Sequence, residues 1–408
     1  MSMKLIQGDC LEVMKALPDN SVDACVTDPP YGLKFMGKKW DYDVPTVEQW
    51  KEVYRVMKPG AFLLSFGGTR TYHRMVVNIE DAGFEIRDQI QWLYGSGFPK
   101  SLSVGKAIDR AAGAKREIVG YAEPLGREKR KANQGKGTGN IPFSEEEGIG
   151  ALNIITAPAT PEAEQWDGWG TALKPANEPI CLARKPIEGT VAANVLKWGT
   201  GGLNIDGCRV GTEENCGRPQ GTMPHPMDWG NRSQKNGIFT TKGNSQGRFP
   251  ANVIHSGEDE VVGLFPDTKS GAMHGVYKNT MMKGQPGIRD GKEVLLHQEA
   301  SEGSAARFFY VAKASKAERG EGNNHVTVKP LKLMCYLCRL VTPPGGTVLD
   351  CYVGSGTTGV AAQIEGFDFI GIDKDIDIAT RRIENTDPLF QAGEVLTVEN
   401  MEKERGKR

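Results

Sequence analysis

The stretch TVLDCYVGSGTTGVAAQIEG, residues 347–366, has the pattern that decides the fold. An apolar strand, Thr347 to Asp350, runs into a turn with three glycines, and a helix follows the turn. Glycines in such a turn let the backbone approach a ligand closely, and the first turn of a helix offers free N–H groups. The stretch therefore predicts a strand–turn–helix unit that binds a ligand at its turn.

The strand after this helix supports a ligand with a ribose. It has the sequence FDFIGID and ends in Asp373, nineteen residues past Gly354. An acid at this position can hold the two hydroxyls of a ribose. Because the glycines also fit the spacing G-x-G-x-x-G, the pattern alone does not separate NAD from S-adenosylmethionine. A tight turn without a ligand is the alternative that needs no function.

Alternating strand and helix patterns surround this unit. Apolar runs and period-two stretches predict strands, whereas apolar residues at helical spacing predict helices. The predicted strands are SVDACVTD (21–28), AFLLSFGG (61–68), FEIRDQIQWLYGSG (84–97) and EPICLARKP (178–186). The predicted helices are TVEQWKEVYRVMKPG (46–60), TRTYHRMVVNIEDAG (69–83) and the segment after HVTVKP (325–330). This rhythm predicts a doubly wound, mostly parallel α/β sheet.

Composition limits the class of protein. A chain of 408 residues is expected to form a core with attached modules. There is no run of 18 apolar residues and no signal-peptide pattern, so we expect no contact with a membrane. Eight cysteines are too few for a disulfide scaffold, which favours the reducing cytoplasm. A net charge of −1 neither supports nor excludes a nucleic-acid partner.

The middle of the chain loses the strand–helix rhythm. Residues 99–165 include GREKRKANQGKGTGN (126–140), which is basic, rich in glycine and predicted to be a mobile loop. Residues 187–305 are also rich in loops and predict a second module. The last residues, MEKERGKR, are expected to fray.

A second stretch, VTDPPYG (26–32), directly follows a predicted strand. The exocyclic amine of a base is a poor nucleophile because its lone pair is delocalised into the ring. Asp28 and the Pro29 carbonyl could accept the two hydrogens of such an amine, and the prolines stiffen that backbone. Tyr31 could stack on a base taken out of the duplex, or face a sulfonium cation. A plain rigid turn is the alternative, because Pro, Asp and Gly are common in turns.

Together, DPPY and the downstream VLDCYVGSGTTG resemble the β group of S-adenosylmethionine-dependent DNA amino-methyltransferases. The resemblance covers most of residues 1–100 and 305–385. Four further stretches in the middle of the chain look like bacterial and phage members: WGTALKPANEPICLARKP, GTGGLNIDG, GRFPANVI and RFFYVAKASKAER. The resemblance implies a Rossmann-like methyltransferase core with seven strands, one of them reversed, and an inserted target-recognition region.

The resemblance also assigns site residues. The catalytic tetrapeptide corresponds to Asp28, Pro29, Pro30 and Tyr31. The cofactor site corresponds to Asp9, Cys10, His325, Thr327, Lys329, Asp350, Tyr352, Gly354, Ser355, Gly356, Thr357, Thr358 and Asp373. Within this set, Asp9 is expected beside the adenine of the cofactor, Asp373 at its ribose, and Thr327 and Lys329 at its methionine end.

Two departures from the family pattern are present. Cys351 and Tyr352 replace the usual Pro-Phe, and Val326 replaces the proline after His325. An aromatic ring remains at 352, so we expect the pocket wall to survive and interpret these changes as tolerated variation.

Other features predict no site. Cys335 and Cys338 could be half of a zinc site, but no second pair lies at a suitable spacing, and they share a helix face with Leu331 and Met334. The basic run REKRK (127–131) fits phosphate contacts and a solvated charge run equally well. Four tryptophans in glycine-rich contexts are expected to pack within their modules and not on DNA: Trp166, Trp169, Trp198 and Trp229.

The prediction is therefore a site-specific methyltransferase that acts on N6 of adenine in double-stranded DNA in a bacterial cytoplasm. The alternatives are an N4-cytosine enzyme of the same fold, a protein glutamine methyltransferase, a non-catalytic DNA-binding module and an NAD-dependent enzyme. A homodimer and a companion endonuclease are left open. The expected division is 1–186 (catalytic half, with a flexible insertion at about 99–165), 187–305 (target recognition), 306–395 (cofactor half) and 396–408 (tail).

Overall fold

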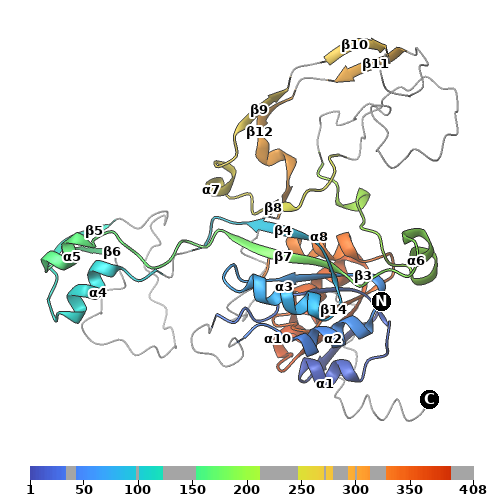
Figure 1. The fold of residues 1–408 in the computed structure, drawn as a ribbon, viewed down its shortest axis with the longest axis horizontal. Coiled ribbons are helices and arrows are strands. Elements are labelled where there is room, and N and C mark those ends of the chain that lie inside the picture. The colour runs from blue at the N-terminus through green and yellow to red at the C-terminus, as the bar shows by residue number, and fades with distance from the viewer. Residues whose placement is uncertain are drawn as a thin grey trace. The chain divides into compact units, whose positions relative to one another are not determined.

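The computed structural model describes nine stretches of the chain (Figure 1): residues 1–33, 43–97, 101–122, 153–211, 247–270, 273–278, 293–298, 301–312 and 328–386. The chain divides into two compact units. One unit combines Met1–Ser96 with Ala176–Arg408, and the other is Gly97–Pro175. The first unit contains both motifs that the sequence singles out.

A nine-stranded sheet forms the centre of the large unit. Neighbouring strands are parallel except β7, which is antiparallel to both β3 and β4. From edge to edge the strands are β1 (Met3–Gln7), β15 (Asp368–Asp373), β14 (Thr347–Asp350), β2 (Val22–Thr27), β3 (Met57–Phe66), β7 (Asn177–Arg184), β4 (Glu85–Leu93), β8 (Val253–His255) and β13 (Tyr310–Val311). The mostly parallel α/β fold is confirmed. Two short strands, β8 and β13, extend the expected seven.

Helices cover both faces of this sheet, as a parallel sheet requires. On one face lie α1 (Cys10–Lys15), α2 (Val47–Val56) and α3 (Tyr72–Asp81), and on the other α8 (Leu331–Val341), α9 (Thr357–Glu365) and α10 (Asp377–Glu384) (Figure 1). Alternate residues of β2 divide between the two cores: Cys25 packs with Trp50 of α2, while Ala24 and Val26 pack with α8. All six residues of β2 are buried. The strand is therefore a fixed base for the DPPY segment that follows it.

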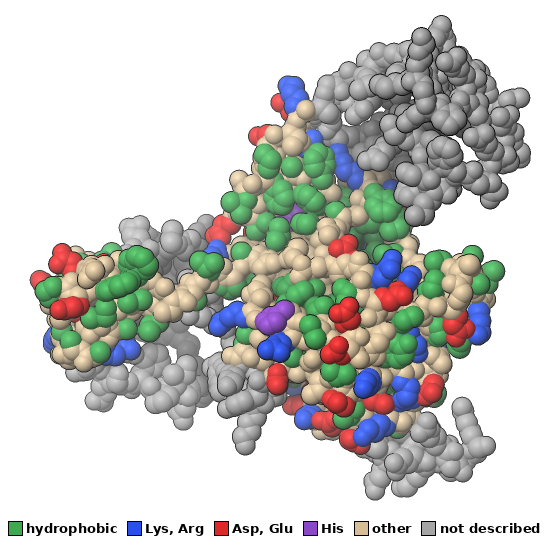
Figure 2. All heavy atoms as spheres, in the orientation of Figure 1, with side chains coloured by type: hydrophobic (Ala, Val, Ile, Leu, Met, Phe, Trp, Pro, Cys, Tyr) green, Lys and Arg blue, Asp and Glu red, His purple; other side chains and the backbone are tan. Residues whose placement is uncertain are grey.

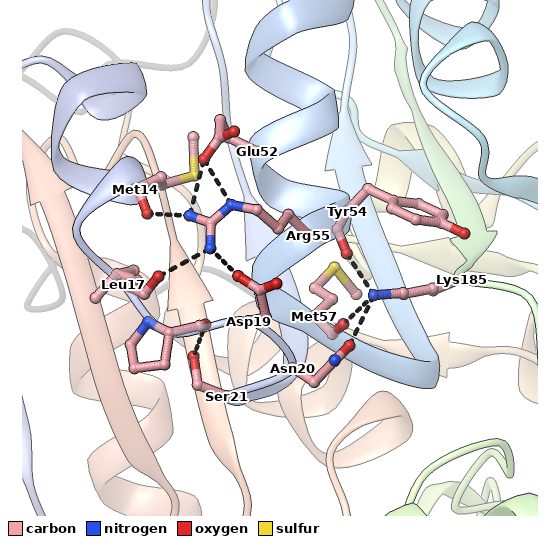
Figure 3. A network of polar contacts seen from close by, with 11 residues as sticks. Met14, Leu17, Asp19, Asn20, Ser21, Glu52, Tyr54, Arg55, Met57 and Lys185 are labelled. Atoms are coloured by element: carbon pink, nitrogen blue, oxygen red, sulfur yellow. Dashed lines mark hydrogen bonds and ion pairs between the residues drawn. The ribbon is translucent and has the colours of Figure 1, made fainter.

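Two basic side chains hold the segment before β2 against the end of α2 and the start of β3 (Figure 3). Arg55 donates to the carbonyl oxygens of Met14 and Leu17 at 2.6 and 2.9 Å. Lys185 is buried and donates to Asn20 Oδ1, Tyr54 O and Met57 O at 2.9, 2.8 and 2.7 Å. The ammonium therefore donates to three oxygen atoms from different segments: the loop before β2, α2 and the start of β3.

Replacing Lys185 by methionine is expected to lower the free energy of unfolding by about 3 kcal/mol, because three oxygens lose a charged donor. Urea denaturation measures this change. Lys51→Met is the control, since Lys51 is exposed on α2, and should change stability by no more than about 0.5 kcal/mol. Equal effects of the two variants would contradict the structural role of Lys185.

The small unit has regular structure where the sequence shows little apolar rhythm. It contains α4 (Val104–Ala111), β5 (Ile118–Ala122), β6 (Asn153–Thr156) and α5 (Pro161–Gln165). Asp109 is buried and accepts from Arg116 Nη1 at 2.8 Å, Thr160 Oγ1 at 2.9 Å and Ala159 N at 3.1 Å. Polar contacts thus organise this unit. GREKRKANQGKGTGN lies outside the described residues.

The surface of the small unit carries exposed apolar side chains. Trp169 is 60% exposed, and its ring meets that of Trp166 edge to face at 5.0 Å. Figure 2 shows hydrophobic side chains on this unit beside acidic and basic ones. The expectation that these two tryptophans pack inside their module is therefore wrong: their rings contact each other but both remain exposed at the surface.

The region expected to be a second module consists of short elements. Its 187–211 part includes α6 (Val191–Trp198) and η4 (Asp206–Cys208). Further along are α7 (Asp259–Val262), the pair β9 (Asp267–Ser270) with β12 (Ser301–Ser304), the pair β10 (Met273–Lys278) with β11 (Glu293–Gln298), and η5 (Ala305–Phe308). Trp198 donates from its indole nitrogen to Glu188 at 3.0 Å. Trp229 lies outside the described residues.

Two further expectations concern a zinc site and a membrane span, and each is compared with the residues that the structure describes. Cys335 and Cys338 are buried in α8 and belong to the core, as their helix face predicts. Within these residues no group of three or more His, Cys, Asp or Glu side chains could hold a metal ion. No helix in the same parts of the chain is long and apolar enough to cross a membrane.

Candidate active site

The DPPY segment lies at the carboxyl end of β2, where open α/β sheets bind ligands. Tyr31 donates from its hydroxyl to Asp28 Oδ1 at 2.8 Å, and its carbonyl oxygen accepts from Thr71 Oγ1 at 2.5 Å. Gly68, after β3, lets the ring lie close: a Cβ there would be 3.1 Å from Tyr31 Cβ. The position of the Tyr31 ring is therefore fixed by the ends of two neighbouring strands.

Lys329 completes this site from the other end of the sequence. Its buried ammonium is 2.7 Å from Asp28 Oδ2 and 3.1 Å from the Tyr31 hydroxyl. The sequence suggests the methionine end of the cofactor for this lysine, whereas the structure shows its ammonium on the carboxylate of Asp28. His325 and Thr327, which share its motif, lie outside the described residues.

Glu178, which no sequence motif indicates, is the fourth member of the cluster. It lies near the start of β7, and its Oε2 is 3.2 Å from Lys329 Nζ and 3.3 Å from the Tyr31 hydroxyl. Because β7 is the reversed strand, its first residues meet the carboxyl ends of its neighbours. Knowledge of that reversal is the signal that would have identified Glu178.

The electrostatics of the cluster follow from burial. Burial alone would lower the pKa of Lys329, but the charges of Asp28 and Glu178 outweigh it and raise that pKa above its ordinary value. Burial and the same two carboxylates raise the pKa of Tyr31 well above its ordinary value. Burial likewise raises the pKa of Tyr94, near Glu178, to about 12. Lys329 is therefore a cation, and both phenols remain hydrogen-bond donors.

The glycine turn lies beside this cluster, at the end of β14. Gly354 N donates to Asp373 Oδ2 at 2.8 Å, so the predicted turn and the predicted acid do meet. Gly356 has a φ of +79°, and a Cβ there would lie 2.7 Å from Ala379 Cα in α10. Only glycine therefore fits this turn without moving α10.

Asp350 links the two motifs. It is buried and accepts from Thr27 Oγ1 at 2.6 Å, Thr358 Oγ1 at 2.5 Å and Tyr352 N at 3.1 Å. Thr27 directly precedes Asp28, and Thr358 lies in the first turn of α9. Burial raises the pKa of Asp350 from 3.8 to about 6, although these hydrogen bonds oppose the shift.

Asp350 gives stability a pH dependence of defined sign. Since its pKa is higher in the folded than in the unfolded chain, the folded state binds more protons between pH 4 and 6, and stability falls as the pH rises through that window. Between about pH 4.5 and about pH 7.5, the free energy of unfolding of the wild type should therefore fall by about 2 kcal/mol more than that of Asp350→Asn. Urea unfolding of both proteins measures the difference. An equal change in the two would contradict this assignment.

The remaining loop side chains bond within the protein. Arg382 of α10 donates from Nη1 to Ser355 O at 2.7 Å, and to Ser355 Oγ and Thr357 Oγ1 at 2.9 Å each. Ser355 and Thr357 are buried. Arg382 is thus a second site residue that no sequence motif indicates, and its bonds fix the shape of the turn.

Asp9 and Cys10 lie at the end of β1, the strand next to β15. Asp9 caps α1 by accepting from Leu11 N at 3.1 Å and pairs with Lys374 at 3.2 Å. Gly8 N donates to Asp373 O at 2.8 Å, so the two acids lie at adjacent strand ends. Burial raises the pKa of the Cys10 thiol to about 12, which keeps it protonated.

These residues fit a nucleoside-type cofactor. The turn has glycines where its backbone would lie closest to a ligand, and the N-terminus of α9 supplies N–H groups. Asp9 and Asp373 lie at adjacent strand ends. The acidic cluster of Asp28 and Glu178 lies at the carboxyl end of β2 and the start of the reversed strand β7. Fold and site together define a Rossmann-like protein in which a glycine turn and an acidic cluster share one edge of the sheet.

Comparison with known proteins identifies the family. The family model described as DNA methylase matches residues 22–122 and 233–383, which together are more than half of the chain. The chain belongs to this family of N6/N4 DNA methylases, and its cofactor is S-adenosylmethionine.

Individual relatives match shorter stretches. M.BglI, a type II methyltransferase of Bacillus subtilis, is 42% identical over 82 residues, which are 17% of this chain and 24% of that protein. YubD of Escherichia coli (strain K12), named as a methylase, is 35% identical over 89 residues, which are 20% and 39%. The chain thus matches well under half the length of either relative.

Solved structures are similar at low identity. The M1.HpyAVI–SAM complex is 15% identical with a TM-score of 0.38, and covers 93% of this chain and 99% of that chain. The PvuII DNA methyltransferase (cytosine-N4-specific) is 12% identical with a TM-score of 0.41, and covers 100% and 92%. At these scores neither likeness bears on the choice between bases.

Proposed function

We propose that this protein transfers the methyl group of S-adenosylmethionine to an exocyclic amine of a base in double-stranded DNA, with adenine N6 as the target. One observation carries the proposal: Asp28 and the turn of Gly354 and Gly356 lie at neighbouring strand ends, joined through Thr27 and Asp350. The acceptor of the amine and the cofactor turn therefore have a fixed spacing.

The chain's own residues would act mainly by orientation and electrostatics. The target base leaves the duplex and enters beside Tyr31, whose ring can stack on it. The Asp28 carboxylate and the Pro29 carbonyl then accept the two amine hydrogens and turn the nitrogen lone pair out of conjugation. The cofactor supplies the methyl group on a positively charged sulfur. As the N–CH₃ bond would form and the S–CH₃ bond would break, the sulfur would keep the bonding electron pair and leave as the neutral thioether of S-adenosylhomocysteine. The Asp28 carboxylate would face the positive charge that develops on nitrogen and would take up the proton that the methylated amine loses.

We propose roles for the cofactor residues on the same basis. Asp373 and Asp9 would hold the ribose and the adenine, and Gly354 and Gly356 would allow the backbone to approach the cofactor. Asp350, Ser355, Thr357 and Thr358 would maintain the turn, because their side chains bond within the protein. Tyr352 and Cys10 would form the wall of the cofactor pocket.

Adenine is the first candidate because the tetrapeptide begins with aspartate. Cytosine N4 is the second, since the same acceptors would serve its amine equally well. An NAD-dependent enzyme would leave the cluster of Asp28, Tyr31, Glu178 and Lys329 without a role.

The division of labour along the chain is part of the proposal. Residues 1–186 and 306–395 would supply the catalytic and cofactor halves, with an insertion at about 99–165, and 187–305 would contact DNA. In support, strands from both halves interleave in the sheet, with β14 between β15 and β2. Action in a bacterial cytoplasm, dimerisation and a companion endonuclease remain predictions.

Transfer of label from S-adenosylmethionine to unmethylated DNA, followed by nucleoside digestion and mass analysis, tests the function. N6-methyladenine is the expected product. If the product were N4-methylcytosine, the same mechanism would hold with cytosine as the target base. Tight cofactor binding without labelled DNA would contradict the proposed substrate and point to RNA or protein.

A further inference from the structure

Glu178 has no assigned task in holding the base or the cofactor, yet it lies within the buried cluster. It is 20% exposed, and it reaches both Lys329 Nζ and the Tyr31 hydroxyl. Lys329 is 8% exposed and has carboxylates on two sides, Asp28 at 2.7 Å and Glu178 at 3.2 Å. The ammonium is therefore shared unequally between two acids, with the shorter contact to Asp28.

Both oxygens of Asp28 already have donors in this structure. Oδ1 accepts from the Tyr31 hydroxyl, and Oδ2 accepts from Lys329. An incoming amine needs one of these oxygens, and an ammonium bonded to the same oxygen competes for its electron density. Removal of that donor requires another acceptor close by, because a buried ammonium without a partner is costly.

Glu178 is that acceptor, and the required movement is small. Lys329 Nζ is already 3.2 Å from Glu178 Oε2, so a shift of a few tenths of an ångström would make this the shorter contact. Without Glu178, the ammonium would have Asp28 as its one carboxylate partner among the contacts described above, and it could not leave Asp28 without becoming an unpaired buried charge.

We propose that Glu178 is a positioning residue, which takes the Lys329 ammonium from Asp28 as the target amine docks and so frees an oxygen of Asp28 to accept the amine. This inference rests on the proposed function of the site. It deepens that function by adding a residue that acts through Lys329 without touching the base.

A double-mutant cycle tests the inference with Glu178→Gln, Lys329→Met and the combined variant. The measurement is the single-turnover methylation rate at saturating S-adenosylmethionine and DNA. Glu178→Gln is expected to slow the reaction about 10- to 100-fold, with dissociation constants for cofactor and DNA within about threefold of wild type. In the Lys329→Met background the same change should slow the reaction no further, because Glu178 then has no ammonium to hold.

Glu80→Gln is the control, since Glu80 is exposed on α3, and thermal unfolding of each variant monitors folding. A wild-type rate in Glu178→Gln, or effects that multiply in the combined variant, would overturn the inference. If Lys329→Met does not fold, the saturated rate and the cofactor affinity of Glu178→Gln test the inference on their own. Weakened cofactor binding in Glu178→Gln with an unchanged saturated rate would also overturn it. Wild-type protein that leaves DNA unmethylated would instead contradict the proposed function.

Discussion

Replacing Asp28 by alanine is expected to lower the saturated rate of methyl transfer by about 100- to 1,000-fold. The substitution removes the carboxylate that would accept an amine hydrogen and leaves Lys329 with Glu178 as its one remaining carboxylate among the contacts described above. Cofactor binding should stay within about tenfold of wild type, because Asp373 and the glycine turn bond to each other and not to Asp28. Single-turnover kinetics with labelled S-adenosylmethionine and calorimetric titration of the cofactor separate the two effects.

Asp81→Ala is the matched control, since it removes an exposed carboxylate at the end of α3. It should leave both rate and affinity unchanged. Asp28→Asn keeps one carbonyl oxygen as an acceptor and should fall between wild type and Asp28→Ala. If Asp28→Ala transferred methyl groups at the wild-type rate, the assignment of the DPPY segment as the catalytic tetrapeptide would be wrong.

The meeting of the two motifs could be predicted from sequence because of how parallel strands are arranged. Asp28 and Gly354 each directly follow an apolar strand, and the carboxyl ends of parallel strands share one edge of a sheet. The same reasoning brings Asp373 to Gly354, where the structure shows a hydrogen bond of 2.8 Å. Local patterns therefore sufficed for residues whose place depends on a strand end.

Glu178 could not be predicted in this way, since its position depends on the direction of one strand. EPICLARKP shows an apolar run and no sign of orientation. Had β7 been parallel to β3, Glu178 would lie at the opposite edge of the sheet. Lys329 is a related case: it precedes α8, and its sequence does not show whether its long side chain reaches the cofactor turn or Asp28.

Residues that act through tertiary packing were also missed. Arg382 lies in an ordinary amphipathic helix, and its bonds to Ser355 and Thr357 arise because α10 packs behind the glycine turn. Asp109 organises the small unit through Arg116 and Thr160, in a region where apolar spacing gives little signal. Both depend on contacts between segments whose separation in the sequence does not reveal their proximity.

Substituting Gly356 by alanine should weaken the binding of S-adenosylmethionine at least about 100-fold. A left-handed backbone costs an alanine about 1 to 2 kcal/mol. In addition, the new Cβ would lie 2.7 Å from Ala379 Cα and 2.9 Å from Ala379 Cβ, so either α10 or the turn must move. Movement of the turn would pull Gly354 N from Asp373 Oδ2, which is the contact that joins the turn to the proposed ribose site. Calorimetric titration with S-adenosylmethionine measures the loss.

Gly366→Ala is a closely matched control for this prediction. Gly366 ends the helix that Gly356 begins, and its φ of +80° is almost the same as the +79° of Gly356. Apart from its neighbours along the chain, no atom of the described residues lies within 4 Å of a Cβ placed at Gly366. Gly366→Ala should therefore cost about 1 kcal/mol of stability and leave cofactor affinity unchanged. The difference between the two variants isolates the steric contact with α10 from the cost of the backbone conformation. If both variants bound the cofactor equally well, the claim that packing against α10 positions the glycine turn for the cofactor would be wrong.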